Sequence, residues 1–502
     1  MKLRLPRSTQ NWITLIGAMI ALVALFMIIF LFAVSLFIEE GHTYLGLVIF
    51  ILLPAVMILG LLLIPIGMFI ERRRRFRKKL EEEEEWPMVD LNDPRHRNAF
   101  FIFSFGTTIL LFLSAFGSYQ AFHFTESVAF CGSICHQVMH PEKIAYENSP
   151  HARVACVACH VGPGANWYVR SKISGLYQVY AVLADVYPKP IPTPIRNLRP
   201  ARETCEQCHW PEKFYAHKLR LETHYLPDEN NTQWNIALVM KIGSPHSAMG
   251  LVEGIHWHIN PDVKIEYIAT DETREELPWV RYTNLKTNEV VVYQDEDSPL
   301  DESEINTQSI RIMDCMDCHN RPSHDYRPPT FFIDDAMVDG SIPKELPEIK
   351  TVAVDLCAET YQTNEEAMNA IKTGIEEYYR ENYPDIFEEQ NELIEKAVGG
   401  LQESFSSNIF PEMKVRWDVY PNHIGHLEFN GCFRCHNDRH ASEDGKVIAK
   451  DCNLCHFINA QGSPDNLEIA KIGEQLEFRH PEDIDEEWKE SLCTDCHTGL
   501  NP

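Results

Sequence analysis

Three long apolar stretches open the chain and dominate its pattern of hydrophobic and polar positions. They cover residues 12–38, 44–70 and 100–122, and each is long enough to cross a lipid bilayer as a helix. A cleaved signal peptide has a shorter apolar core and a small-residue cleavage site, so we interpret the first stretch as a retained anchor. The pattern therefore predicts three N-terminal transmembrane helices.

Basic residues around these stretches predict the orientation of the chain in the membrane. The connector at 39–42 has no Lys or Arg. The basic residues before the first helix and after the second are Lys2, Arg4, Arg7, Arg72, Arg73, Arg74, Arg75, Arg77, Lys78 and Lys79. By the positive-inside rule, the N-terminus and the second loop are cytoplasmic, and everything after about Phe124 is periplasmic. The alternative is that the arginine run is a partner-docking patch and the acidic run 81–85 an interaction tail.

Beyond residue 124 the pattern changes twice. Residues 264–270 and 289–293 have strand-like composition between turn residues and predict a small antiparallel insert at about 221–306. Residues 365–380 and 386–405 have helical periodicity.

Fourteen of the fifteen cysteines fall in seven short motifs, six of them Cys-x-x-Cys-His and the first Cys-x-x-x-Cys-His. In chain order, sites one to seven are Cys131/Cys135/His136, Cys156/Cys159/His160, Cys205/Cys208/His209, Cys315/Cys318/His319, Cys432/Cys435/His436, Cys452/Cys455/His456 and Cys493/Cys496/His497. Two thiols at this spacing add across the vinyl groups of one porphyrin, and the next residue supplies an imidazole to the iron. The motifs therefore predict seven covalently attached c-type haems.

Zinc sites and disulfides are the alternatives for these cysteines. Zinc ribbons pair two Cys-x-x-Cys units around one metal and need no histidine directly after each second cysteine. Cys357, the remaining cysteine, is expected to be a buried, unreactive thiol. Because haem contacts can replace an ordinary side-chain core, we expect a multihaem cytochrome c that is mostly α-helical and irregular, with three N-terminal transmembrane helices and a haem-packed periplasmic domain carrying a small β insert.

The expected periplasmic part is strongly acidic. Residues 1–97 hold 12 Lys and Arg against 10 Asp and Glu, so the formal net charge of −28 for the whole chain leaves −30 on residues 98–502. Such a surface repels nucleic acid and attracts basic proteins, so a basic periplasmic c-type cytochrome or reductase is the expected electron acceptor. Solubility alone explains an acidic exterior equally well.

Several longer motifs resemble the NapC/NirT (NrfH-like) family of membrane-anchored tetrahaem quinol dehydrogenases. They are Ser-Pro-His151-Ala-Arg-Val-Ala-Cys156-Val-Ala-Cys159-His160-Val-Gly-Pro-Gly, then Lys172, Thr-Cys205-Glu-Gln-Cys208-His209-Trp-Pro-Glu-Lys-Phe, and Cys315-Met-Asp-Cys318-His319-Asn-Arg-Pro-Ser-His324. With three membrane helices and three further C-terminal motifs, the whole chain resembles the heptahaem inner-membrane cytochromes with which metal-reducing bacteria pass quinol electrons outward.

The resemblance implies a division of the chain and a direction of electron flow. The expected parts are a membrane hairpin with a cytoplasmic loop at 1–97, a third transmembrane helix at 98–124, a NapC/NirT-like tetrahaem domain at 125–330, and a helical linker with a C-terminal trihaem domain at 331–502. Electrons from menaquinol or ubiquinol would enter at haem one and leave through the C-terminal haems. The alternatives are an electron-relay subunit without its own quinol site and a terminal multihaem reductase.

The family also implies axial ligands. A histidine upstream of site two and one five residues after His319 cross over in relatives, which maps His151 onto haem four and His324 onto haem two; binding a haem propionate is the alternative role for each. At haem one the extra residue shifts His136, and relatives use a methionine just after the motif, so Met139 competes with His136. A methionine that merely packs on the porphyrin edge is the alternative.

The remaining irons need sixth ligands from histidines outside the motifs. The candidates are His217, His426, His440 and His480. His256 and His258 flank Trp257 in an expected strand, where a structural histidine is at least as good an explanation. The sequence does not pair these histidines with particular irons.

Quinol oxidation needs an apolar slot near a haem and groups that bind the quinol and accept its protons. Lys172 falls where the family has a lysine that contacts quinol, although a residue snorkelling to lipid phosphates is the alternative. The family's acidic partner would come six or seven residues later, where this chain has Gln178 and Val179. Because glutamine cannot take a proton, Asp185, a water chain or a haem propionate is expected to serve.

Overall fold

The computed structural model describes residues 11–37, 49, 52–78, 90–134, 136–162, 164–193, 200–211, 214–247, 250–252 and 254–500. Outside them lie Lys2, Arg4, Arg7, Lys79, Cys135, the connector at 39–42 and the acidic run at 81–85. The chain divides into two compact units, Met1–Ile134 with Ala155–Tyr177, and Cys135–Val154 with Gln178–Pro502.

Three helices of the first unit are long and apolar enough to cross a membrane. They are α1 (Trp12–Phe37), α3 (Leu53–Lys78) and α4 (Pro94–Glu126), with candidate spans at Trp12–Ala33, Leu53–Arg74 and Phe100–Glu126. Large apolar side chains cover the outer surfaces of all three, which suits contact with lipid chains. The prediction of three membrane helices is confirmed within the described part of the chain.

Glycines allow α1 and α3 to pack closely. A Cβ atom added to Gly17 would lie 2.7 Å from the carbonyl oxygen of Gly60, closer than real Cβ atoms come to such a group. Small residues at a helix contact let two membrane helices approach backbone to backbone. Further along α1, the rings of Phe26 and Phe30 lie 5.4 and 5.7 Å from the ring of Phe112 on α4.

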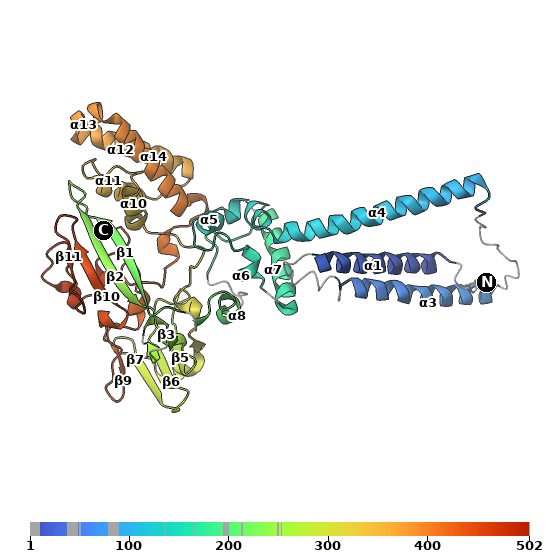
Figure 1. Cartoon of the computed structure of the whole chain (residues 1–502), viewed down its shortest axis with the longest axis horizontal. Helices are drawn as coiled ribbons and strands as arrows, with labels where there is room; N and C mark the ends of the chain where they lie inside the picture. The colour runs from blue at the N-terminus through green and yellow to red at the C-terminus, as the bar shows by residue number, and fades with distance from the viewer. Residues whose placement is uncertain are drawn as a thin grey trace. The chain divides into compact units, whose positions relative to one another are not determined.

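The second unit contains two antiparallel sheets built from distant parts of the chain (Figure 1). The strands in chain order are β1 (His217–Tyr225), β2 (Gln233–Lys241), β3 (Ser244–Ser247), β4 (Gly250–Val252), β5 (Val263–Ile268), β6 (Trp279–Asn284), β7 (Val290–Asp295), β8 (Arg311–Ile312), β9 (His440–Ser442), β10 (His456–Gly462) and β11 (Glu468–Ile469). One sheet has the order β1-β2-β10-β11 and the other β8-β5-β6-β7-β9, while β3 and β4 form a separate pair.

Both sheets therefore cross the expected division at residue 330. The strands predicted at 264–270 and 289–293 are β5 and β7, which confirms them. However, C-terminal strands complete both sheets: β10 pairs with β2 and β9 pairs with β7. The β structure is larger than a local insert because it recruits strands from the segment that carries sites five to seven.

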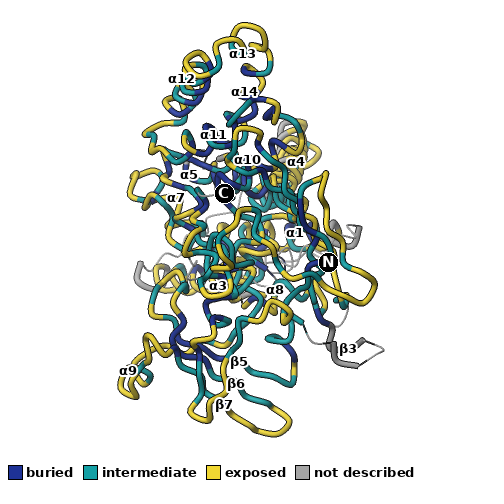
Figure 2. Tube along the Cα trace, turned by 90° about the vertical axis from the view of Figure 1, so that its left-hand side faces the viewer, coloured by how far each residue is buried: buried dark blue, intermediate teal, exposed yellow. Residues whose placement is uncertain are grey.

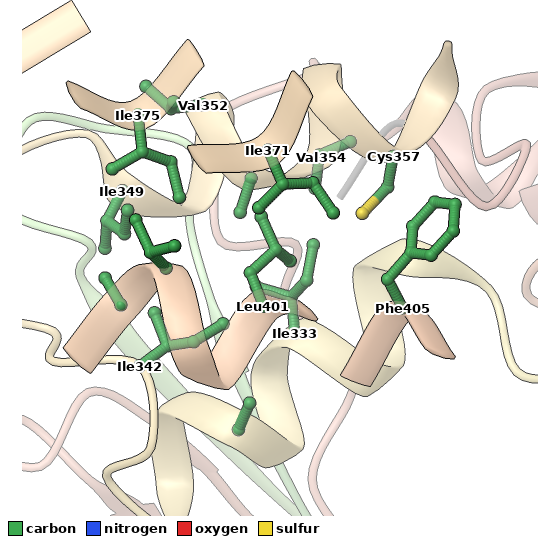
Figure 3. Close-up of a cluster of buried hydrophobic side chains, with 14 of the residues drawn as sticks. Ile333, Ile342, Ile349, Val352, Val354, Cys357, Ile371, Ile375, Leu401 and Phe405 are labelled. Atoms are coloured by element: carbon green, nitrogen blue, oxygen red, sulfur yellow. The ribbon is translucent and has the colours of Figure 1, made fainter. Parts of the chain in front are cut away.

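A helical region that lies between β8 and β9 in the chain has its own hydrophobic core. Its helices are α10 (Pro329–Val338), α11 (Ile349–Ala358), α12 (Asn364–Asn382), α13 (Pro384–Glu389) and α14 (Asn391–Asn408). Along α12, Ala367, Ile371, Ile375 and Tyr379 recur every fourth residue and are all buried, as an amphipathic helix requires. Figure 3 shows side chains of α10, α11, α12 and α14 pointing toward one another, with Cys357 among them. In Figure 2, α10, α11, α12 and α14 each include buried segments, whereas α13 has no buried residue.

Cys357 is buried as the sequence predicts, and burial raises the pKa of its thiol.

A buried ion pair joins this region to the first sheet. The Lys350 ammonium, fully buried on α11, donates to the carboxylate of Asp334 on α10. The same carboxylate accepts from the backbone N–H of Tyr225 at 3.1 Å and from Nδ1 of His224 at 3.1 Å, both on β1. Asp334 is therefore fully used, as a buried carboxylate must be to offset its desolvation.

Candidate haem-binding sites

Each described motif occupies a short helical turn. The turns are α6 (Cys156–His160), the end of α8 (Ala201–Cys205), η6 (Cys315–Asp317), η9 (Gly431–Arg434), η10 (Cys452–Leu454) and η12 (Cys493–Asp495). In sites three, four, five and seven the backbone N–H of the histidine donates to the backbone carbonyl oxygen of the first cysteine, at 2.8 to 3.0 Å. One turn of helix therefore brings both thiols and the imidazole of a motif to one place.

Thiols of successive motifs are also neighbours. Within the first unit, a hydrogen bond between the thiols of Cys131 and Cys156 lowers the pKa of Cys156 to about 7, by more than burial raises it. Within the second unit, a hydrogen bond with Cys205 lowers the pKa of Cys315, against burial. Sites one and two, and sites three and four, thus bring their first thiols together.

Cys496, the second thiol of site seven, is exposed in the described chain. Its backbone N–H donates to the carbonyl oxygen of Cys493 at 3.2 Å, so it lies one turn beyond Cys493. In the same motif, Sγ of Cys493 lies 3.6 Å from Nδ1 of His426, and Asp495 is exposed beside Cys496. The motif spacing determines the direction of a thiol but not what covers it, so haem attachment at Cys496 stays a prediction.

Three other motif cysteines are exposed in the same way. They are Cys159 of site two, Cys208 of site three and Cys452 of site six. An accessible thiol can still form a thioether bond, because the reaction needs the sulfur to reach the porphyrin vinyl group.

In the described part of the chain, five histidine pairs have the spacing that one iron with two axial imidazoles requires. A metal lies about 2 Å from a bound imidazole nitrogen, and the nitrogen about 1 Å from the ring centre, so two axial rings are separated by about 6 Å. The observed ring-centre distances are 5.9 Å for His151–His209, 6.3 Å for His256–His319, 5.9 Å for His258–His436, 6.1 Å for His426–His456 and 6.1 Å for His480–His497. Each pair joins one motif histidine, from sites three to seven, to one histidine outside the motifs.

Hydrogen bonds orient these rings. Nδ1 lies within hydrogen-bonding distance of a backbone carbonyl oxygen in His151 (Pro322, 2.9 Å), His256 (Ile242, 3.1 Å), His258 (Ile255, 2.9 Å), His436 (Ala449, 3.0 Å) and His480 (Glu482, 3.0 Å). A carbonyl at Nδ1 fixes the tautomer and directs Nε2 toward a metal, the usual arrangement of a metal-binding histidine. The donor set therefore fits iron-bound haem.

The pairing differs from the one that the family resemblance implies. His151 was expected opposite His319, but its ring lies against His209 of site three, and His256 faces His319 instead. The local sequence could not show this, because the turn that carries His256 reaches site four only through the fold of the sheets. Nδ1 of His324 lies 3.1 Å from the Glu142 carbonyl oxygen. The expected partner of His324, site two, belongs to the other unit, and that assignment stays a prediction.

His440 is not placed as a ligand, contrary to the expectation from its position after site five. Its ring is fully buried; Nε2 donates to the carbonyl oxygen of Leu277 at 2.7 Å, and Nδ1 lies 3.0 Å from the side-chain amide of Asn437. Both nitrogens are therefore engaged within the protein. His217 begins β1, and the ring that it contacts within the described chain is that of Phe457, at 6.3 Å.

Site one is described only in part. Cys131 lies on the π-helical turn η3 (Phe130–Ile134), and α5 (His136–Glu147) follows. Cys135 and the side chain of His136 lie outside the described residues, whereas Met139 is half-buried on α5. The competition between His136 and Met139 at haem one stays a prediction.

The helix α7 (Ala165–Leu183) carries two of the three quinol-site candidates. Lys172 is half-buried, and its ammonium lies 5.2 Å from the centre of the Tyr168 ring. At 3.6 residues per turn, Val179 shares the face of Lys172, whereas Gln178 lies about a third of a turn away. Asp185 lies beyond the end of α7 in a left-handed conformation. Its backbone N–H donates to the carbonyl oxygen of Val182, and the N–H of the next residue donates to the carbonyl oxygen of Ala181, so these bonds end the helix. The structure therefore does not gather Gln178 and Asp185 on the face of Lys172.

Apolar side chains flank Lys172 on its own face. Val169, Leu176 and Val179 are 50%, 73% and 46% exposed. Val169 comes three residues before Lys172, and the other two come four and seven residues after it, which places all of them along one stripe of the helix. A cation in an exposed apolar stripe suits an amphipathic ligand or the edge of a bilayer.

Membrane-length helices, together with thiol–imidazole motifs whose histidines face second histidines, define a membrane-anchored c-type cytochrome that carries electrons. The model of the NapC/NirT cytochrome c family, N-terminal region, matches residues 94–190. Cytochrome c-type protein ImcH of Geobacter sulfurreducens is 45% identical over 491 residues, which cover 97% of this chain and 95% of ImcH. The chain belongs to the NapC/NirT cytochrome c family, as its motifs predict. No solved structure matches it.

Proposed function

We propose that this protein is a heptahaem cytochrome of the bacterial inner membrane that oxidises quinol and delivers the electrons to a periplasmic acceptor. Its N-terminus is cytoplasmic and its haem-bearing part periplasmic. The process served is anaerobic respiration or extracellular electron transfer. The observation that carries the quinol step is the exposed apolar stripe on α7 with Lys172 in its middle.

The seven motifs hold the cofactors in this proposal. Their cysteines form the thioether bonds and their histidines the first axial bonds, with Met139 or His136 at site one. When bound, the haems supply one-electron carriers between the two-electron quinol and the acceptor. His151, His426 and His480 supply second axial bonds at sites three, six and seven, because their rings lie about 6 Å from the motif histidines.

Lys172 binds a quinol oxygen in this proposal. Its ammonium donates a hydrogen bond to the head group, while Val169, Leu176 and Val179 contact the ring and the isoprenoid tail. Protons leave through water or a haem propionate, because Val179 cannot accept one and Asp185 lies past the end of the helix. The three side chains are apolar and the site needs only one polar anchor, which is the usual composition of a small-molecule site.

The acceptor is a basic periplasmic protein in this proposal. The C-terminal segment around site seven exposes nine acidic side chains: Glu474, Glu477, Glu482, Asp483, Asp485, Glu486, Glu487, Glu490 and Asp495. Opposite charges on two electron-transfer partners raise the rate at which they meet, and salt lowers that rate. A basic c-type cytochrome or reductase fits this surface.

The test is quinol-driven reduction of the air-oxidised, purified protein under anaerobic conditions, followed by haem absorption. We expect rapid reduction of the natural protein and at least about tenfold slower reduction of Lys172→Ala, which corresponds to about 1.4 kcal/mol. Arg170→Ala is the matched control, because Arg170 also stacks on an aromatic ring of α7, at 5.3 Å from Trp167, but on the opposite side of the helix.

Two results would contradict the proposal. If Lys172→Ala is reduced as fast as Arg170→Ala, the apolar stripe is not the quinol site. If dithionite reduces all haems but quinol reduces none, the protein is a relay subunit or a terminal reductase, and its partners must be sought elsewhere.

A further inference from the structure

One short turn places two histidines against the motif histidines of two different sites. The turn is η5 (Ile255–Ile259), with the sequence Ile-His-Trp-His-Ile. The ring of His256 lies parallel to that of His319 in site four, with 15° between the planes and 6.3 Å between the centres. The ring of His258 lies perpendicular to that of His436 in site five, with 90° between the planes and 5.9 Å between the centres.

The turn is held firmly by its neighbours. Between its two histidines, Trp257 stacks on Tyr282 of β6 at 5.5 Å, so the turn is anchored on the second sheet. Gly254 lets the turn lie close to the end of β2, because a Cβ atom at this position would clash with backbone atoms of residues 241–243. These contacts fix the backbone that carries both imidazoles.

The hydrogen bonds of the two rings differ from those of histidines that only support the fold. His256 and His258 each use Nδ1 on a backbone carbonyl oxygen, and Nε2 of neither ring has a hydrogen-bond partner among the described residues. By contrast, His440 uses both nitrogens, and so does His423, which bonds the carbonyl oxygens of Asp317 at 3.1 Å and Thr273 at 3.0 Å. Nε2 of each ring is therefore the nitrogen that could bind a metal.

We propose that His256 and His258 are the sixth ligands of the irons attached at sites four and five. The inference rests on the haem attachment given under the proposed function and adds to it a single ligand-bearing turn. Sites four and five are separated in the chain by the whole helical region, α10 to α14. The turn therefore links haem four, the last haem of the part that resembles the NapC/NirT family, to haem five, the first of the three C-terminal haems.

The test replaces each histidine by methionine in the full-length protein, which is then oxidised and examined by near-infrared magnetic circular dichroism. We expect His256→Met and His258→Met each to convert one haem from two-histidine to histidine–methionine ligation, and the double variant to convert two. Methionine ligation raises the reduction potential, so each variant also moves one step of a redox titration upward. Trp257→Phe is the control, because it keeps the ring stack and both histidines; its ligation spectrum should be unchanged.

A second set of variants assigns the affected haem. When Cys315 and Cys318 are both replaced by serine, haem four is absent, and adding His256→Met should then change no remaining ligation signal. In the otherwise intact chain, His256→Gly should show one high-spin haem that free imidazole returns to the low-spin state. This rescue reports ligation even where a methionine variant is poorly folded.

Three outcomes would overturn the inference while leaving haem attachment intact. The methionine variants could bind seven haems by pyridine haemochrome and show natural ligation. Both variants could alter the same haem. Imidazole could fail to restore a low-spin signal in the glycine variant. By contrast, a haem count near zero in the natural protein would refute the proposed function itself.

Discussion

The two engaged nitrogens of His440 predict a structural role that replacement by leucine should expose. His440→Leu removes the bond to the Leu277 carbonyl oxygen and the contact with the Asn437 amide, both made in a fully buried position. Each buried polar group left without a partner costs about 1–3 kcal/mol, so the expected loss of stability is about 2–5 kcal/mol. At about 2–4 °C per kcal/mol, the melting temperature should fall by on the order of 10 °C.

The assay combines thermal unfolding at a fixed scan rate with haem ligation spectra. His440→Leu should melt earlier yet keep every low-spin haem of the natural protein. His426→Leu is the contrasting variant, because the ring of His426 faces His456 at 6.1 Å and is expected to be a ligand. That variant should show one new high-spin haem.

The reasoning fails if His440→Leu produces a high-spin haem. Such a result would mean that Nε2 binds iron rather than the Leu277 carbonyl, and that ring pairs about 6 Å apart are not a guide to ligation here.

Three further perturbations test the packing. Gly17→Leu should separate α1 from α3 and lower the yield of membrane-inserted protein, whereas Gly117→Leu, at a position with open space around it, should not; quantitative blotting of membranes checks both. Lys350→Met strands a buried carboxylate and should cost about 3–5 kcal/mol in urea unfolding, and adding Asp334→Asn should recover part of the loss. Burial lowers the pKa of His224, but hydrogen bonds with carboxylates raise it by a larger amount, so the pKa rises to about 9. Charged His224 therefore stabilises the fold by up to about 3 kcal/mol below its unfolded pKa near 6.5, and this contribution is lost as pH rises through about 9; the melting temperatures of His224→Gln and the natural protein should converge there.

The sequence predicted the elements that depend on local pattern. The apolar runs, the helix at 365–380 and the strands β5 and β7 follow from periodicity over a few residues, and each is present. The predicted helix at 386–405 is divided between α13 and α14, which meet at Gln390. Periodicity did not show the break, because the polar residues that form it also occur within amphipathic helices.

The proposed ligand pairs depend on contacts that local pattern does not encode. His256 and His258 alternate with Trp257, which is the pattern of a strand, but they form a tight turn whose two rings diverge to two sites. His440 lies at a suitable sequence distance from site five, yet β9 directs its ring to Leu277. In the proposed assignment, His256 and His258 use only Nδ1 on the protein, whereas His423 and His440 use both ring nitrogens.

The sheet that joins β2 to β10 has a consequence for how the protein matures. These strands lie roughly 200 residues apart, so β2 keeps an open edge until the segment that carries β10 has been made and can pair with it. Under the proposed function, haem attachment at the earlier sites would therefore take place on a chain whose sheets are still incomplete. A shortened version that ends before β10 would present the unpaired edge of β2 to other chains, so the C-terminal segment is needed to complete the fold.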